Sequence, residues 1–108
     1  MAHSSDVKQS IALTAGENFE KYIGTSAVDI TNCRIKSIVV HTSAADAIVK
    51  LYDEADNSKT ASALKYHILF GTGVNETWEH TFPGDGIKCA NGVYCDLTNV
   101  DHVTIMFT

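Results

Sequence analysis

The stretch from Gly84 to Thr108 constrains the fold more than any other part of this chain. It contains three short runs in which apolar and polar residues alternate, at 87–89, 93–97 and 102–108. Alternation with a period of two is the pattern of β-strands that bury one face. The stretch therefore predicts three antiparallel strands at the end of a β protein whose sheets have one apolar and one polar face.

An Asn-Gly dipeptide, Asn91-Gly92, separates the first two runs. This dipeptide between alternating segments is a strong signal for a β-hairpin. A two-residue loop would mix apolar and polar side chains on both faces, whereas a three-residue loop at 90–92 keeps them apart. We therefore predict a hairpin with the three-residue loop, in which Ile87 pairs with Cys95 and Cys89 with Val93.

The rest of the chain supplies further short segments with strand character between turn-forming residues. The segment 17–23 is ambiguous, because its apolar spacing also suits one helical turn, but it is short and we favour a strand or an irregular cover. About eight short strands predict an all-β fold, an antiparallel β-sandwich of jelly-roll type in one domain over 1–108. The other predicted strands are 9–14, 32–42, 46–53, 63–70 and 75–82.

The composition of the chain argues against several classes of function. The formal net charge is -5, which is not the basic balance of a protein that binds phosphate backbones, so we expect no nucleic-acid partner. No apolar run approaches the roughly 18 residues needed to span a bilayer, so we expect no membrane insertion. The first ten residues lack the apolar core of a secretory signal, which favours folding in a reducing compartment.

The three cysteines, Cys33, Cys89 and Cys95, form no C-x-x-C pair. Their odd number is not that of a closed disulfide framework, and their spacing is not that of a zinc site. In the predicted hairpin Cys89 and Cys95 lie diagonally, a geometry that does not favour a disulfide. We therefore predict that all three are free thiols that serve as small core residues.

The polar residues give no strong signal for catalysis or metal binding. No H-x-H pattern is present, and the neighbours Glu79 and His80 would point to opposite faces of a strand. The acidic turn 53–57 lacks the spacing and the glycine of a calcium loop, and no G-x-S-x-G or phosphate-binding glycine motif occurs. We therefore expect a protein that is not an enzyme and holds no cofactor or metal. The histidines considered as ligands are His41, His67, His80 and His102.

Aromatic residues are the remaining candidates for binding. The predicted register puts Tyr94 on the polar face beside Lys88 and Asp96, where a large ring suggests contact with another chain or a ligand. Trp78 and Tyr52, with Tyr66, suit either an interface or a stacking platform for a sugar. The residues predicted to lie at an interface are Tyr94, Trp78 and Tyr52.

The C-terminal sequence resembles the ends of small virion proteins of tailed phages. These proteins close with a pattern of the type G-x-G-I/L-x-x-x-N-G-L/V-Y-V-x-L-T, followed by an alternating strand. An upstream x-V-x-L-Y-D segment is also similar, and the resemblance covers roughly residues 30–108, with Cys95 where these proteins usually carry valine. The matching residues are Gly84, Gly86, Ile87, Asn91, Gly92, Val93, Tyr94, Leu97, Thr98, Val103, Ile105 and Phe107, and upstream Val49, Leu51, Tyr52 and Asp53.

This resemblance implies a β-sandwich component of a phage virion, made in the host cytoplasm. It implies a capsid cement or decoration protein that bridges capsomers, with itself, as a homotrimer, and the major capsid protein as partners. A fibre or tail accessory protein is one alternative, and a small carbohydrate-binding module with a glycan partner is another. Residues 1–25 match nothing in these proteins, and we interpret them as a candidate arm towards a neighbouring subunit.

Overall fold

The structure, a computed structural model, describes residues 7–72 and 74–108. The described residues form eleven strands and one short 3₁₀ turn, η1 (Ala61–Ala63). The strands are β1 (Lys8–Gln9), β2 (Glu17–Asn18), β3 (Glu20–Ile23), β4 (Ser26–Asp29), β5 (Cys33–Thr42), β6 (Ile48–Tyr52), β7 (Leu64–Leu69), β8 (Thr77–Thr81), β9 (Ile87–Cys89), β10 (Tyr94–Thr98) and β11 (Val100–Phe107).

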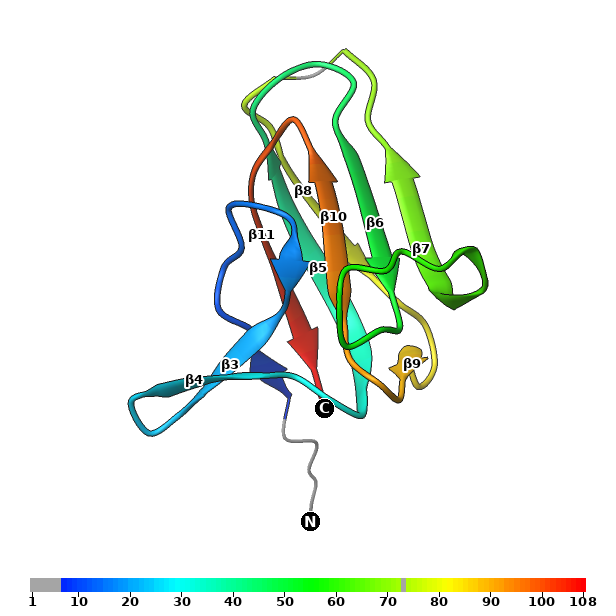
Figure 1. Ribbon diagram of the computed structural model, residues 1–108. Helices are drawn as coiled ribbons and strands as arrows, with labels where there is room; N and C mark the ends of the chain where they lie inside the picture. Colours follow the sequence, from blue (N-terminus) through cyan, green and yellow to red (C-terminus); the bar gives the residue numbers. More distant parts are fainter. Residues whose placement is uncertain (1–6, 73) are drawn as a thin grey trace.

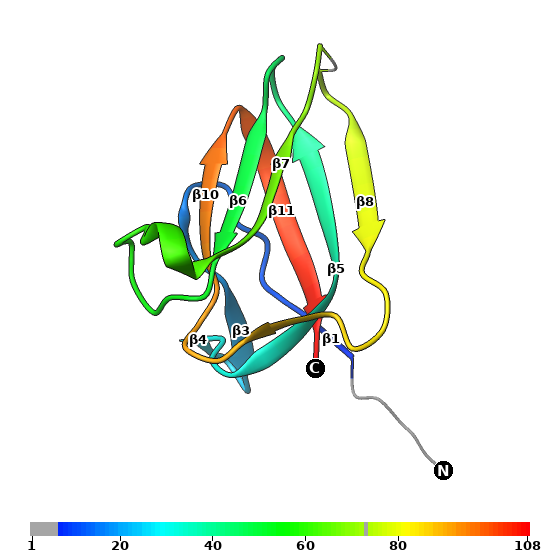
Figure 2. The same cartoon turned by 90° about the vertical axis from the view of Figure 1, so that its right-hand side faces the viewer.

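Two antiparallel sheets pack face to face (Figures 1 and 2). Sheet A has the strand order β1-β11-β5-β8, and β9 also pairs with β5. Sheet B has the order β2-β10-β6-β7, and β3 and β4 form a separate two-stranded hairpin. The predicted all-β, antiparallel sandwich is confirmed. The strand count is higher than predicted because the segment before residue 30 contributes four short strands.

The core lies between the two sheets and follows the predicted alternation. In β11 the inward residues Val103, Ile105 and Phe107 are buried, and in β6 so are Val49 and Leu51. In β5 the alternation shifts once, because the register against β11 is irregular between Met106 and Phe107. This irregularity acts like a β-bulge, which lets residues on both sides of it face the core. The apolar β5 side chains that are fully buried are Ile35, Ile38 and Val40.

The predicted hairpin around Asn91-Gly92 is wrong. β9 pairs with β5 in sheet A, whereas β10 pairs with β6 in sheet B, so the dipeptide lies in a corner between sheets. The Asn91 N–H donates a 2.7 Å hydrogen bond to the Asp53 carboxylate, and a Cβ at Gly92 would come within 2.7 Å of the Glu54 carbonyl oxygen. Close packing against the loop after β6 therefore holds this corner. The predicted inward face is nevertheless correct, since Cys89, Val93 and Cys95 are fully buried.

The segment 8–30 closes one side of the sandwich. Leu13 forms an isolated bridge with Val103 in place of the longer strand predicted at 9–14. The segment 17–23 forms strands β2 and β3, so the strand interpretation is confirmed. Main-chain bonds continue across the segment, where the Phe19 N–H donates to the Val93 carbonyl and the Ile30 N–H to the Phe19 carbonyl, each at 2.9 Å. Of the candidate arm, residues 8–19 thus pair with the sandwich, and 1–6 lie outside the described residues.

Candidate functional site

Two of the three predicted interface residues are buried. Tyr94 points to the outer face of sheet B, as predicted, but only 7% of it is exposed, and Tyr52 is 6% exposed. The two residues pair across β10 and β6, and their rings lie 6.4 Å apart. The segment before β2 covers them, since a Cβ at Gly16 would lie 3.5 Å from the Tyr94 hydroxyl. The expectation that Tyr94 stands exposed among polar residues is therefore wrong.

Trp78 lies in a row of aromatic side chains on the side of the sandwich where the edge strands β7 and β8 face each other. Its ring meets that of Phe70 edge-on at 5.4 Å, and the ring of Tyr66 meets that of Phe82 at 5.0 Å. The Tyr66 hydroxyl and His80 Nδ1 form a 2.9 Å hydrogen bond that links the two strands. Burial raises the pKa of the Tyr66 hydroxyl above its usual value. The half-buried side chains here are Trp78, Tyr66 and His80. They fill the gap between the two edge strands but remain partly exposed to solvent.

Apolar residues are exposed at both ends of β7 and just before β8. Leu69 is 66% exposed, Val74 50% and Leu64 37%. Leu64 and Leu69 are the first and last residues of β7, and Val74 precedes β8. The other edge of β7 has no strand partner in the described part of the chain, so it offers free main-chain donors and acceptors. We call this part of the molecule the β7–β8 side; it comprises the aromatic row between β7 and β8, the free edge of β7, and the exposed residues Leu64, Leu69 and Val74.

The β3–β4 hairpin is the feature that sequence reasoning missed. It projects away from both sheets (Figure 1), and near its turn Tyr22 is 65% and Ile23 62% exposed. Gly24 follows them with a positive φ of 62°, which suits a tight turn. The signal was the dipeptide Gly24-Thr25 between two short apolar pairs, but β4 itself has no strong alternation.

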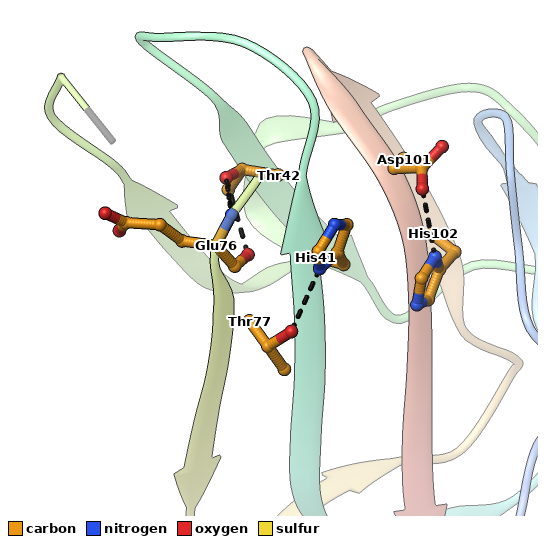
Figure 3. A network of polar contacts seen from close by, with 6 residues as sticks. All are labelled: His41, Thr42, Glu76, Thr77, Asp101 and His102. Atoms are coloured by element: carbon orange, nitrogen blue, oxygen red, sulfur yellow. Dashed lines mark hydrogen bonds and ion pairs between the residues drawn. The ribbon is translucent and has the colours of Figure 1, made fainter. Parts of the chain in front are cut away.

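Histidines from different strands meet on the outer face of sheet A (Figure 3). The rings of His41 in β5 and His102 in β11 stack at 5.1 Å with planes 9° apart. His41 Nδ1 and the Thr77 hydroxyl lie 2.9 Å apart, and His102 Nδ1 lies 3.4 Å from an oxygen of Asp101. The contact between His41 and Thr77 and the stacking of the two histidine rings together connect β8, β5 and β11 on the surface. No sequence pattern indicates this pair, because alternation along a strand does not reveal that β5 and β11 are neighbours.

The other polar contacts in Figure 3 join Thr42 to Glu76 and are structural. The Glu76 N–H donates to the Thr42 hydroxyl at 3.2 Å, and that hydroxyl donates to the Glu76 carbonyl at 3.4 Å. Thr42 is only 1% exposed, so these bonds satisfy a buried hydroxyl where β5 ends. His67 is exposed on β7, and His80 belongs to the aromatic row, so the four histidines do not converge.

The acidic loop after β6 lines a shallow hollow of about 450 Å³. Its carboxylates hold the loop itself: Asp56 accepts bonds from the N–H and hydroxyl of Ser58, and Glu54 accepts bonds from Thr60 in the same way. The bonds from Ser58 lower the pKa of the Asp56 carboxyl. The carboxylates considered as calcium ligands thus serve as loop-stabilising acceptors.

Within 7–72 and 74–108, no group of three or more His, Cys, Asp or Glu side chains is placed to hold a metal ion. In the same ranges, no helix has the length and apolar character to cross a membrane. The three cysteines are free and buried, as predicted.

Comparison with protein families, curated proteins and solved structures finds no match to this chain.

Proposed function

We propose that this protein is a structural component of a phage virion, a capsid cement or decoration protein that self-assembles and bridges capsomers. The resemblance of residues 30–108 to small virion proteins supports the virion assignment. A β-sandwich with a separate projecting element suits a protein whose task is to make contacts. In this proposal the partners are further copies of the chain and the major capsid protein.

The observation that carries the proposal is the β3–β4 hairpin. Isolated two-stranded hairpins are marginally stable in water, and this one exposes Tyr22 and Ile23 near its turn. Covering such side chains stabilises a contact by about 1.5–3 kcal/mol each. A projecting hairpin with an apolar end is therefore well suited to dock on another subunit.

The β7–β8 side is the matching surface. In Figure 1 the hairpin extends from the lower left of the molecule, whereas β7 forms its right-hand edge. The outer face of β7 carries Lys65, and the hairpin carries the carboxylates Glu20 and Asp29 as well as Lys21, so one ion pair to Lys65 can form across the contact. Contact between different surfaces of identical subunits is heterologous, and it produces a ring when the rotation closes. We propose a closed ring of three subunits.

Two variants test this arrangement. The hairpin variant, Tyr22→Ser with Ile23→Ser, and the side variant, Leu69→Ser with Val74→Ser, each remove one half of the contact and are expected to be monomeric. An equimolar mixture restores one intact contact per pair and is expected to form a dimer. Val7→Ser is the control. It also removes an apolar side chain that is 48% exposed, but Val7 belongs to neither of the two contact surfaces. A mixture that stays monomeric, or two variants that still assemble, would contradict the arrangement.

Binding to shells tests the capsid role separately. Empty shells assembled from the major capsid protein of the encoding phage are sedimented with the purified protein. Co-sedimentation of the unaltered protein supports the cement role. A protein that assembles but stays in the supernatant would overturn that role and favour the tail or fibre accessory alternative. Loss of glycan-array binding in Trp78→Ala would instead favour the carbohydrate-binding alternative.

A further inference from the structure

Cys33 and Cys89 are directly opposite each other in the pairing of β5 with β9. Residues directly opposite in antiparallel strands have side chains on the same face. Both thiols point into the core, with 3% of Cys33 and none of Cys89 exposed. Folding thus brings together two cysteines that are distant in the chain, which neither their spacing nor the predicted hairpin indicated.

The spacing of such a pair is compatible with a covalent bond. Opposite residues in antiparallel strands have Cα atoms about 4.5–5.5 Å apart, within the range of about 4.4–6.8 Å found in disulfides. Cys33 is the first residue of β5 and Cys89 the last of β9, so each lies at a strand end where small shifts are easiest. Cys95 lies in sheet B opposite Leu51 and serves as an internal reference.

We propose that Cys33 and Cys89 are a latent disulfide site, which forms a cross-strand bond when the folded protein meets a small disulfide or another two-electron thiol oxidant. The bond would fasten the β9 corner to the start of β5. This inference does not depend on the proposed function. The pair stays a dithiol in a reducing compartment and closes in an oxidising one.

Glutathione disulfide oxidises the pair in two thiol–disulfide exchange steps. The Cys33 thiolate attacks one sulfur of the oxidant, which breaks its S–S bond, forms a mixed disulfide and releases one glutathione thiolate. The Cys89 thiolate then attacks the Cys33 sulfur, which forms the protein disulfide and releases the second glutathione. The protein loses two electrons and two protons, and the oxidant is reduced to two glutathione molecules.

The local environment makes this step slow at neutral pH, and Cys33 is the expected first nucleophile because it alone of the two has any exposed surface. Burial raises the pKa of Cys33 to about 11, against the opposing influence of the nearby Lys88 ammonium. Burial and the neighbouring Cys33 raise the pKa of Cys89 further, to about 12. The thiolate is the reacting form, so the oxidation rate is expected to rise about tenfold per pH unit and to keep rising above pH 9.

The experiment is oxidation of the full chain by glutathione disulfide, followed by counting of free thiols. The protein is brought to equilibrium at pH 8.5, quenched in acid, unfolded and labelled with N-ethylmaleimide. The intact mass is expected to show a fall from three labels to one, and peptide mapping should place the last label on Cys95. The oxidised protein is expected to melt about 10 °C higher or more, since the bond closes a long loop.

Variants of the three cysteines show which two of them form the bond. Cys95→Ala is expected to oxidise at a rate within about twofold of the unaltered protein, whereas Cys33→Ala and Cys89→Ala form no intramolecular bond. The mapping of the unaltered protein is decisive even if a core variant fails to fold. Three labels after equilibration, a bond that includes Cys95, or only glutathione adducts and intermolecular dimers would each overturn the proposal.

Discussion

The two sides of the sandwich, where its sheets end, are closed in different ways. On the N-terminal side, made by residues 8–30, main-chain hydrogen bonds run from Ser10, Leu13 and Phe19 to both sheets, and Leu13 and Phe19 are buried. On the β7–β8 side, half-buried rings and one side-chain hydrogen bond span the gap between the edge strands. On the N-terminal side, the main-chain hydrogen bonds help to specify the fold. On the β7–β8 side, where only side chains fill the gap, apolar surface and a strand edge stay available for contacts.

The largest effect is expected from truncating the buried ring of the N-terminal side. Phe19→Ala should lower the free energy of unfolding by about 3–5 kcal/mol, because Phe19 is fully buried. The matched variant Trp78→Ala on the other side should cost only about 2 kcal/mol, because that ring is half-buried. Urea unfolding at neutral pH measures both. Equal losses would show that the two sides do not differ in the way described.

A glycine in the turn between β8 and β9 lies close to the main chain of β5. A Cβ at Gly86 would lie 2.2 Å from the Ile35 carbonyl oxygen, and Gly86 has a φ of 78°. Gly86→Ala should therefore destabilise the fold by about 3 kcal/mol. Gly84→Ala is the control, because Gly84 also has positive φ but meets nothing within 4 Å, and it should cost about 1 kcal/mol. Urea midpoints of the two variants are compared, and a cost for Gly86→Ala no greater than that for Gly84→Ala would contradict the close approach.

The core between the two sides should respond to alkaline pH. Unfolded thiols ionise near pH 8.5–9, whereas burial raises the pKa of Cys33 to about 11, that of Cys89 to about 12 and that of Cys95 still further. The folded state therefore holds more protons above pH 9, and the free energy of unfolding should fall as pH rises from about 8.5 to 11.

The size of this alkaline loss is of order 1 kcal/mol per thiol by about pH 10. The measurement is the urea midpoint at several pH values with a reducing agent present. Cys95→Val, which conserves volume, should leave stability at pH 7 within about 1.5 kcal/mol and remove about one third of the alkaline loss. An unchanged alkaline loss in this variant would mean that Cys95 does not titrate as described.

The smallest effect is expected at the hydrogen bond of the β7–β8 side. Tyr66→Phe removes the hydroxyl that meets His80 Nδ1 and should cost about 1 kcal/mol. Above pH 10 the variant should lose stability less steeply than the unaltered protein, because the raised pKa of the buried Tyr66 hydroxyl makes the folded state retain a proton that the unfolded state releases. Thermal unfolding between pH 7 and 11 checks both effects. A cost above about 3 kcal/mol would show that this bond is a main support of the fold.

The sequence predicted which residues face the core better than it predicted which strands are neighbours. Alternation correctly placed Val103 and Ile105 inward, because side chains in a strand change face at every residue. The same alternation carries no information on pairing, so Ile87–Cys89 was assigned to a hairpin with the next strand when it pairs with β5. Hydrogen bonding and packing against the loop after β6, which join residues far apart in the chain, decided that corner.

The candidate site was harder to predict for a related reason. Tyr94 does point outward, but Gly16 and its neighbours cover it. No local sequence pattern predicts that a distant segment of the chain will bury an outward-facing side chain. The β3–β4 hairpin depends on strands of four residues, too short for their alternation to stand out. The pairing of Cys33 with Cys89 likewise depends on which strands are neighbours, which no local pattern predicts.

The oligomeric mass of the purified protein tests the central claim most directly, because that claim is assembly through the projecting hairpin and the open β7–β8 side. Light scattering across a range of protein concentrations is expected to give three times the chain mass of 11.7 kDa. The hairpin variant should give the chain mass itself. A mass of 11.7 kDa for the unaltered protein at every concentration would contradict the account.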